Sequence, residues 1–143
     1  MAEEKSVVLS GNQIMTAFAQ EKMRLEETNR GINSVQAILE EILFAKESLN
    51  AIKKTKKGEK AMVSLGAGVY LDVLVDKSTK VKSSRAGGVI IEKETSAAIE
   101  EIEQREKETI EKLEQLEKVQ RASYANLNAL GQMITQAEKS FKK

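Results

Sequence analysis

Positions seven residues apart are mostly apolar, with some polar exceptions, in two long segments of the chain. In the first segment the repeating positions are Phe18, Leu25, Ile32, Leu39 and Lys46, and Ile14, Glu21, Thr28, Val35, Ile42 and Leu49. In the second segment they are Ile99, Glu106, Leu113, Gln120, Leu127, Ile134 and Phe141, and Ile102, Thr109, Leu116, Ser123, Leu130 and Ala137. This spacing predicts two helices, over residues 10–57 and 95–142, that pair along a coiled-coil seam. Gly31 lies inside the first helix, and we expect it to face away from the seam.

Local signals mark both ends of the first helix. Ser10 and Gln13 have the spacing of a capping box, and Leu9 and Ile14 have the spacing of the accompanying hydrophobic staple. Gly58 follows a lysine-rich stretch and is a natural helix stop. The chain contains no proline, so no ring clash or missing donor interrupts either helix.

Residues 60–93 have a different pattern, and we call this segment the head. Val69, Leu71, Val73 and Val75 alternate with other residues at a period of two, which indicates a strand. A short apolar run at residues 89–91 is typical of a strand that is buried on both faces. Four short strands in two hairpins are therefore predicted.

Gly66-Ala67-Gly68 is interpreted as a turn between two strands. A dinucleotide-binding fingerprint would need a third glycine where Leu71 stands, and a helix rather than a strand after the glycines.

The order helix, hairpins, helix predicts a single α+β domain over residues 1–143. The helices fold back on each other as a long antiparallel coiled coil, with the two β-hairpins at one end. Isolated hairpins are marginal in water, and free strand edges invite pairing with other chains. We therefore expect the hairpins to join an oligomeric β-barrel through ten apolar residues, the head cluster. These are Met62, Val63, Leu65, Val69, Leu71, Val73, Val75, Val89, Ile90 and Ile91.

Composition excludes several kinds of chemistry. The chain has no cysteine and no histidine, which rules out disulfides and imidazole catalysis and argues against a transition-metal site. Glutamates alternate with lysines as on a solvated helix face, so no catalytic residues, cofactor or enzymatic activity are expected. The net charge of +1 argues against nucleic-acid binding. Without a long apolar run or a secretory signal, neither a membrane span nor export is expected, and the predicted location is the cytoplasm.

Further apolar residues gather where the first helix starts and the second ends. An antiparallel coil would bring them together at the end away from the head, and we call them the tip cluster. The tip cluster comprises Ile14, Met15, Phe18, Leu127, Leu130, Met133, Ile134 and Phe141. Packing in the seam is one explanation, but Met15 and Met133 lie off the seam. Flexible apolar side chains at an open end suit promiscuous binding.

Two segments of the head carry a family resemblance. Val63-Ser64-Leu65-Gly66-Ala67-Gly68-Val69-Tyr70 resembles the glycine-containing first hairpin of α-type prefoldin subunits. Gly87-Gly88-Val89-Ile90-Ile91-Glu92-Lys93 resembles the entry into the second long helix of that family. The resemblance implies a hetero-hexamer of two α-type and four β-type subunits. It also implies coil tips that hold unfolded client proteins without nucleotide and pass them to a group II chaperonin.

Two other functions fit the same pattern. One is a structural or filament-forming coiled-coil scaffold, in which the head polymerises and no client binds. The other is an α-type subunit that serves in a dedicated adaptor complex.

Overall fold

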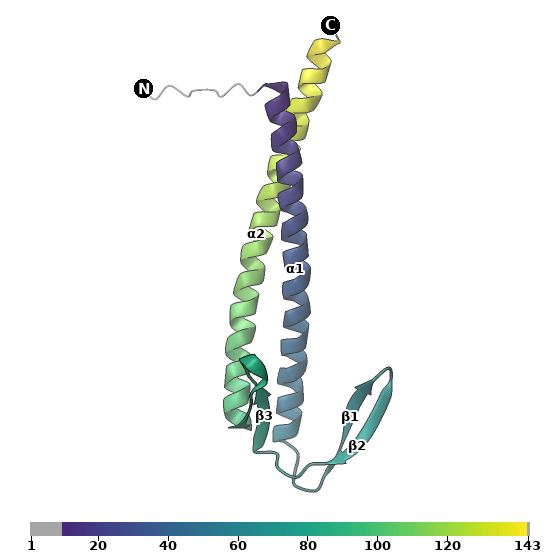
Figure 1. Cartoon of the computed structure of the whole chain (residues 1–143), viewed down its shortest axis with the longest axis vertical. Helices are drawn as coiled ribbons and strands as arrows, with labels where there is room; N and C mark the ends of the chain where they lie inside the picture. Colours follow the sequence, from purple (N-terminus) through teal and green to yellow (C-terminus); the bar gives the residue numbers. More distant parts are fainter. Residues whose placement is uncertain (1–9, 143) are drawn as a thin grey trace, which may run out of the picture. The chain divides into compact units, whose positions relative to one another are not determined.

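The structure, a computed structural model, describes residues 10–142 and contains two long helices and two β-hairpins (Figure 1). In chain order the elements are α1 (Gly11–Lys53), β1 (Lys60–Gly66), β2 (Val69–Leu74), β3 (Lys80–Ser84), the short 3₁₀ helix η1 (Ala86–Gly88), β4 (Ile90–Glu94) and α2 (Thr95–Phe141). This confirms the predicted α+β class. The chain forms two compact units, and both helices run through both of them. The first unit holds α1 up to Gln36 and α2 from Glu111, and the second holds Ala37–Ile110.

The predicted capping box starts α1. The backbone N–H of Ser10 donates to Gln13 Oε1 at 2.7 Å, and the N–H of Gln13 donates to Ser10 Oγ at 3.3 Å. Two of the N–H groups that a helix start leaves without a helical partner are thus satisfied. Leu9, the predicted staple partner of Ile14, lies outside the described residues.

The first helix ends at Lys53, earlier than the predicted end at residue 57. The next turn is tighter, because the N–H of Thr55 donates to the carbonyl of Ile52 three residues back, at 3.0 Å. Gly58 then adopts a positive φ of 84°, and its N–H donates to the carbonyl of Val75 at 2.8 Å. Pairing with the end of the first hairpin therefore begins at Gly58, the residue that the sequence predicted as the helix stop.

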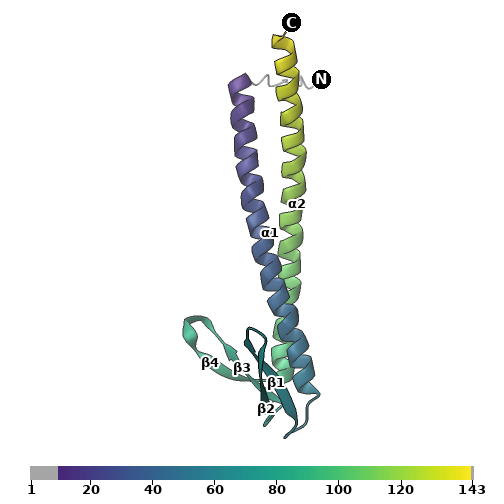
Figure 2. The same ribbon diagram turned by 90° about the vertical axis from the view of Figure 1, so that its right-hand side faces the viewer.

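In the first unit the helices lie antiparallel (Figure 2), and the seven-residue pattern gives the seam. Leu25, Ile32 and Val35 of α1 are buried. Asn29 Oδ1 accepts a 2.7 Å hydrogen bond from Gln120 Nε2 of α2. The seam of this unit is therefore mainly apolar, but it includes polar positions such as Gln120 and the buried Thr28.

Gly31 does not face away from the seam as expected. A Cβ atom placed on it would lie 3.6 Å from Leu116 Cδ1 of α2. Gly31 immediately precedes the seam residue Ile32, and this heptad position flanks the seam. The prediction for this residue was wrong, although the 3.6 Å distance is an ordinary contact and the space would admit an alanine.

In the second unit, Ile42 of α1 and Ile99 of α2 are buried. Lys46 Nζ donates to Glu106 Oε2 across the seam at 2.6 Å. The charges of Lys46 and Glu106 thus compensate each other at two polar positions of the repeat.

The two hairpins are separate antiparallel sheets. In the first, Val63 of β1 pairs with Leu71 of β2, and the register shifts between Ser64 and Gly66. The predicted Gly66–Gly68 turn follows, with positive φ at all three residues, including 51° at Ala67. In the second hairpin, Ser83 of β3 pairs with Ile91 of β4.

Thr95 joins the second hairpin to α2. Its N–H donates to the carbonyl of Thr79 at 2.8 Å, and its hydroxyl donates to the carbonyl of Ser78 at 2.7 Å. The residue is almost fully buried. The first residue of α2 therefore holds the bend at Ser78 and Thr79, immediately before β3.

Candidate functional site

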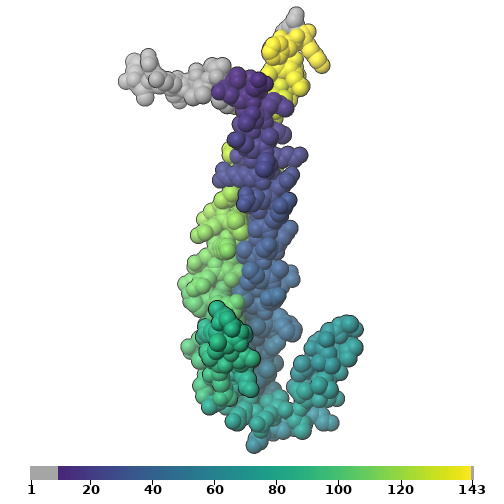
Figure 3. Space-filling view, viewed as in Figure 1, coloured from purple at the N-terminus to yellow at the C-terminus, as the bar shows by residue number. Residues whose placement is uncertain are grey.

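The start of α1 and the end of α2 lie at the same end of the first unit (Figure 3). The tip cluster predicted from the sequence is divided there between seam and surface. Half-buried members are Ile14, Phe18, Leu127, Leu130 and Ile134. Exposed members are Met15, Met133 and Phe141. Seam packing therefore accounts for the first group but leaves the second group in contact with water.

An apolar groove of about 210 Å³ lies at this end, and we call it the tip groove. It is lined by Gly11, Asn12, Ile14, Met15, Ile134, Ala137, Glu138 and Phe141. Met15 is 56% exposed and Phe141 is 90% exposed, so the apolar wall of the groove is open to solvent. Ala137 was not among the predicted tip residues, although it shares the seven-residue spacing of Leu130.

The remaining tip residues line other surfaces. Leu130 and Met133 border a second groove of about 340 Å³, together with Ala17, Gln20, Glu21, Asn126 and Ala129. Leu127 borders a third groove of about 540 Å³, which runs along α2. The predicted residues thus share one end of the coil but do not form a single pocket.

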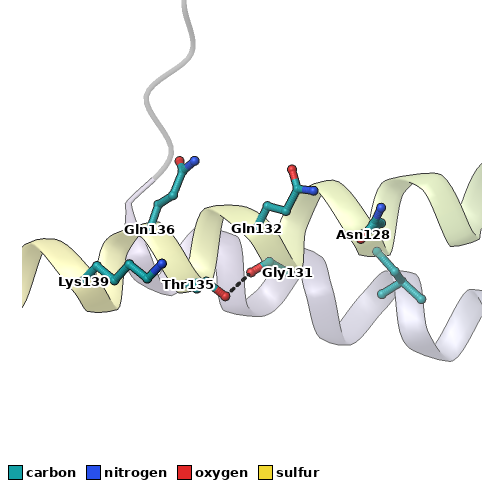
Figure 4. Close-up of a pocket in the computed structure, with 7 residues that line it drawn as sticks. Asn128, Gly131, Gln132, Thr135, Gln136 and Lys139 are labelled. Carbon is teal, nitrogen blue, oxygen red and sulfur yellow. Dashed lines mark hydrogen bonds between the residues drawn. The ribbon is translucent and has the colours of Figure 1, made fainter.

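The third groove is lined mostly by residues with polar side chains (Figure 4). Asn128, Gln132 and Gln136 contribute amide groups, which donate and accept hydrogen bonds, and Lys139 adds a cation. The hydroxyl of Thr135 donates within the helix, to the carbonyl of Gly131 at 3.0 Å. This surface offers the hydrogen-bonding groups that a peptide backbone needs, beside the apolar tip groove.

Two polar atoms in the seam of the first unit are buried without a hydrogen-bond partner among the described residues. They are Oε1 of Glu21 and Oγ of Ser123. A buried polar group without a partner costs about 1–3 kcal/mol. The helix pairing in this unit is therefore weaker than an all-apolar seam of the same length would give.

The first hairpin presents an apolar face. Paired residues of a hairpin share a face, so Val63 and Leu71 lie together with Ala61 and Val73. In the described chain Val63 is 45% exposed and Leu71 is 51% exposed. Met62 pairs with Asp72 and so lies on the opposite face, although the sequence placed it in the same cluster.

The second hairpin separates two residues that the sequence grouped together. Ile91 pairs with Ser83 and is half-buried, whereas Ile90 lies on the opposite face and is exposed. Val89 precedes β4 and is also exposed. Within residues 10–142, this strand is therefore not buried on both faces.

Some charged side chains in the second unit form ion pairs. The hydrogen bond from Lys46 to Glu106 raises the pKa of Lys46 above its ordinary value of 10.5, because it stabilises the ammonium form. Glu101 of α2 contacts Lys93 of β4, and its other carboxylate oxygen lies 3.1 Å from Arg85 Nη1. These ion pairs connect α1 with α2 and β4 with α2. None of their residues lines a groove of the first unit.

Residues 10–142 contain no cluster of three or more acidic, histidine or cysteine side chains that could hold a metal ion. Over the same residues, no helix has the length and apolar character needed to cross a membrane.

Comparisons with known proteins agree on one family. The prefoldin family model, described as prefoldin subunit, matches residues 22–140. A protein from Methanothrix thermoacetophila, "Prefoldin subunit alpha", is 26% identical over 93 residues, which cover 65% of this chain and 61% of the relative. The chain thus spans about three fifths of the length of that relative.

A solved structure with a similar fold is the cryo-EM structure of filamentous PFD from Methanocaldococcus jannaschii. Its TM-score is 0.64 at 22% identity, and the match covers 83% of this chain and 96% of that one.

Proposed function

The chain belongs to the prefoldin subunit family, a family of chaperones without enzymatic activity, and from this premise we propose a specific role for it. It is an α-type subunit that captures unfolded polypeptide at the tip cluster without ATP. It acts in the cytoplasm and delivers the captured chain to a group II chaperonin.

The observation that carries this proposal is the open tip groove. Phe141 and Met15 keep most of their surface in water although they sit on an otherwise paired coil. Flexible methionine and an exposed aromatic ring adapt to apolar side chains of many shapes. The neighbouring amide-rich groove supplies partners for the backbone of the same extended chain.

One tip of this size would bind weakly, because the apolar groove holds only about 210 Å³. Several tips on one complex would raise the affinity by about 10²–10⁴ without a new kind of contact. The proposed function therefore requires assembly.

The apolar face of the first hairpin supports such an assembly. A two-stranded hairpin with Val63 and Leu71 half in water is marginal by itself. We place this face inside a β-barrel shared with β-type prefoldin subunits, in a hetero-hexamer of two α-type and four β-type chains.

A filament-forming scaffold is the second candidate. It is favoured by the similar solved structure, which is that of a filamentous prefoldin. Light scattering over a range of concentrations separates the two assemblies, because a closed complex keeps one mass whereas a filament grows with concentration.

The test of client capture is a pair of substitutions at the tip. Met15→Ser with Phe141→Ser removes exposed apolar surface without changing a buried seam residue. Phe44→Ser is the matched control, because Phe44 is 70% exposed on α1 in the second unit. The tip variant should lose most of its ability to suppress aggregation of a denatured protein, and the control should keep it. Equal protection by the tip variant and the unmodified chain, in complexes of equal mass, would refute the proposal.

A further inference from the structure

All four methionines among residues 10–142 lie at the surface. Met15, Met23, Met62 and Met133 are 46% to 72% exposed. Methionine is a residue type that proteins often bury completely. Here leucine, isoleucine, valine and alanine occupy the buried apolar positions instead. The thioether groups are therefore accessible to small reagents, and the packed seam does not depend on them.

Two of these methionines flank the seam at the tip. Met15 follows Ile14, and Met133 precedes Ile134. Ile14 and Ile134 both line the tip groove, and Met15 is part of its wall. Met133 borders the second groove beside Leu130. A change in either thioether therefore alters an apolar groove at the tip without altering a buried residue.

The composition makes these thioethers the main targets of a peroxide. The chain has no cysteine, tryptophan or histidine, so no thiol competes for the oxidant. Oxidation of methionine to the sulfoxide converts a flexible apolar side chain into a polar one. Oxidation at the tip therefore removes the apolar, adaptable character of the two groove walls.

We propose that Met15 and Met133 form a reversible oxidation site that regulates the apolar tip. The sulfur lone pair attacks one oxygen of hydrogen peroxide, an S–O bond forms, and the O–O bond breaks. The proton of the transferred hydroxyl passes to the departing hydroxide, so the products are a sulfoxide and water. A methionine sulfoxide reductase reverses the change. In that step two thiols supply two electrons and become a disulfide, and the sulfoxide oxygen leaves as water.

The effect of oxidation on client capture rests on the proposed function. A client that covers these grooves would bury a sulfoxide oxygen in place of a thioether, and a buried polar group without a partner weakens binding. We expect the affinity for the client to fall about 3–10-fold. The coil should stay folded, because no buried seam residue changes.

The modification site is tested on the full-length chain with hydrogen peroxide and peptide mapping by mass spectrometry. Met15 and Met133 should be oxidised in the folded chain at rates within about threefold of those in urea, because both are exposed. Helix content by circular dichroism should be unchanged, and a methionine sulfoxide reductase should restore both side chains. Rates more than about threefold lower in the folded chain, loss of helix, or sulfoxides that the reductase does not repair would overturn the inference.

The effect on the client is tested with two double variants, each compared with itself before and after peroxide. The test variant, Met15→Leu with Met133→Leu, carries apolar side chains that peroxide does not oxidise. The matched control, Met23→Leu with Met62→Leu, removes the same number of thioethers outside the tip cluster. Each chain is treated alone, freed of peroxide and assembled with untreated β-type subunits. Light scattering then selects complexes of equal mass.

The client is reduced, carboxymethylated lysozyme, which stays unfolded. Peroxide should weaken its binding by the unmodified chain and by the control about 3–10-fold, and should leave its binding by the test variant unchanged. An equal loss in the test variant, or no loss in an unmodified chain that carries both sulfoxides, would overturn the regulation. Absence of client binding by every untreated complex would instead refute the proposed function, while reversible oxidation of the folded chain would still support the modification site.

Discussion

Replacing Leu71 by aspartate should separate assembly of the chain from its folding. Leu71 is 51% exposed in the described chain and shares the apolar hairpin face with Val63. An aspartate there remains in water while the chain is alone. It is buried only when a partner covers the face. The substitution should therefore weaken the free energy of association rather than that of folding.

The size of the effect follows from the exposed area. Full burial of a leucine side chain contributes about 1.5–3 kcal/mol, so covering the exposed half contributes about 0.8–1.5 kcal/mol. A buried carboxylate without a partner adds a penalty of at least about 2 kcal/mol. The sum of about 3 kcal/mol would weaken association more than 100-fold for each affected hairpin, at about 1.4 kcal/mol per factor of ten.

The assay is light scattering after size-exclusion chromatography, on the chain mixed with β-type subunits. Ser64→Asp is the matched control, because Ser64 pairs with Tyr70 on the opposite face of the same hairpin. Its hydroxyl accepts a hydrogen bond from the N–H of Gly66, which an aspartate can also accept. Leu71→Asp should remain unassembled with normal helix content, and Ser64→Asp should assemble. Full assembly of Leu71→Asp, or equal loss in both variants, would show that this face is not the interface.

Three further outcomes are expected. Ile42→Ala empties a buried seam position and should lower the free energy of unfolding by about 2–5 kcal/mol in chemical denaturation; a loss below 1 kcal/mol would contradict a packed seam. The pKa of Lys46 is raised by Glu106, so this pair stabilises the fold fully below pH 10.5, and the contribution is lost as the pH rises further. The stability advantage of the unmodified chain over Glu106→Gln should therefore shrink above pH 10.5, and a constant difference would argue against the pair. Client protection should be unchanged by ATP or by a chelator, and an ATP-dependent rate in the isolated complex would contradict the proposed mechanism.

The seven-residue repeat predicted the seam because burial in a two-helix coil depends mainly on spacing. Leu25, Ile32, Val35 and Ile42 are buried where the repeat places them. The capping box was equally readable, since its hydrogen bonds join residues only three positions apart. Local and periodic signals were therefore sufficient for the helices and for the confirmed fold class.

Features that depend on close packing could not be predicted from the sequence in the same way. The repeat identifies the seam stripe but not how closely its flanks approach, and Gly31 was misplaced for that reason. The end of α1 at Lys53 reflects pairing of residues 58 and 59 with Val75, a contact distant in sequence.

The head and tip clusters show the same limit. Composition groups apolar residues, but strand register assigns Met62 and Leu71 to opposite faces. At the tip, helix geometry distributes Ile14 and Leu130 between different grooves. The face or groove on which an apolar residue lies depends on the residue that it pairs with. A single sequence does not specify that partner.

Site-specific crosslinking tests most directly whether the tip holds the client. A benzophenone label on Met15→Cys reports contacts at the tip groove, and the same label on Phe44→Cys reports contacts on an exposed part of α1 in the second unit. With assembled complexes and reduced, carboxymethylated lysozyme, the label at position 15 should crosslink to the client, and the label at position 44 should give only background. Equal yields from both positions, or crosslinks from position 44 alone, would contradict capture at the tip.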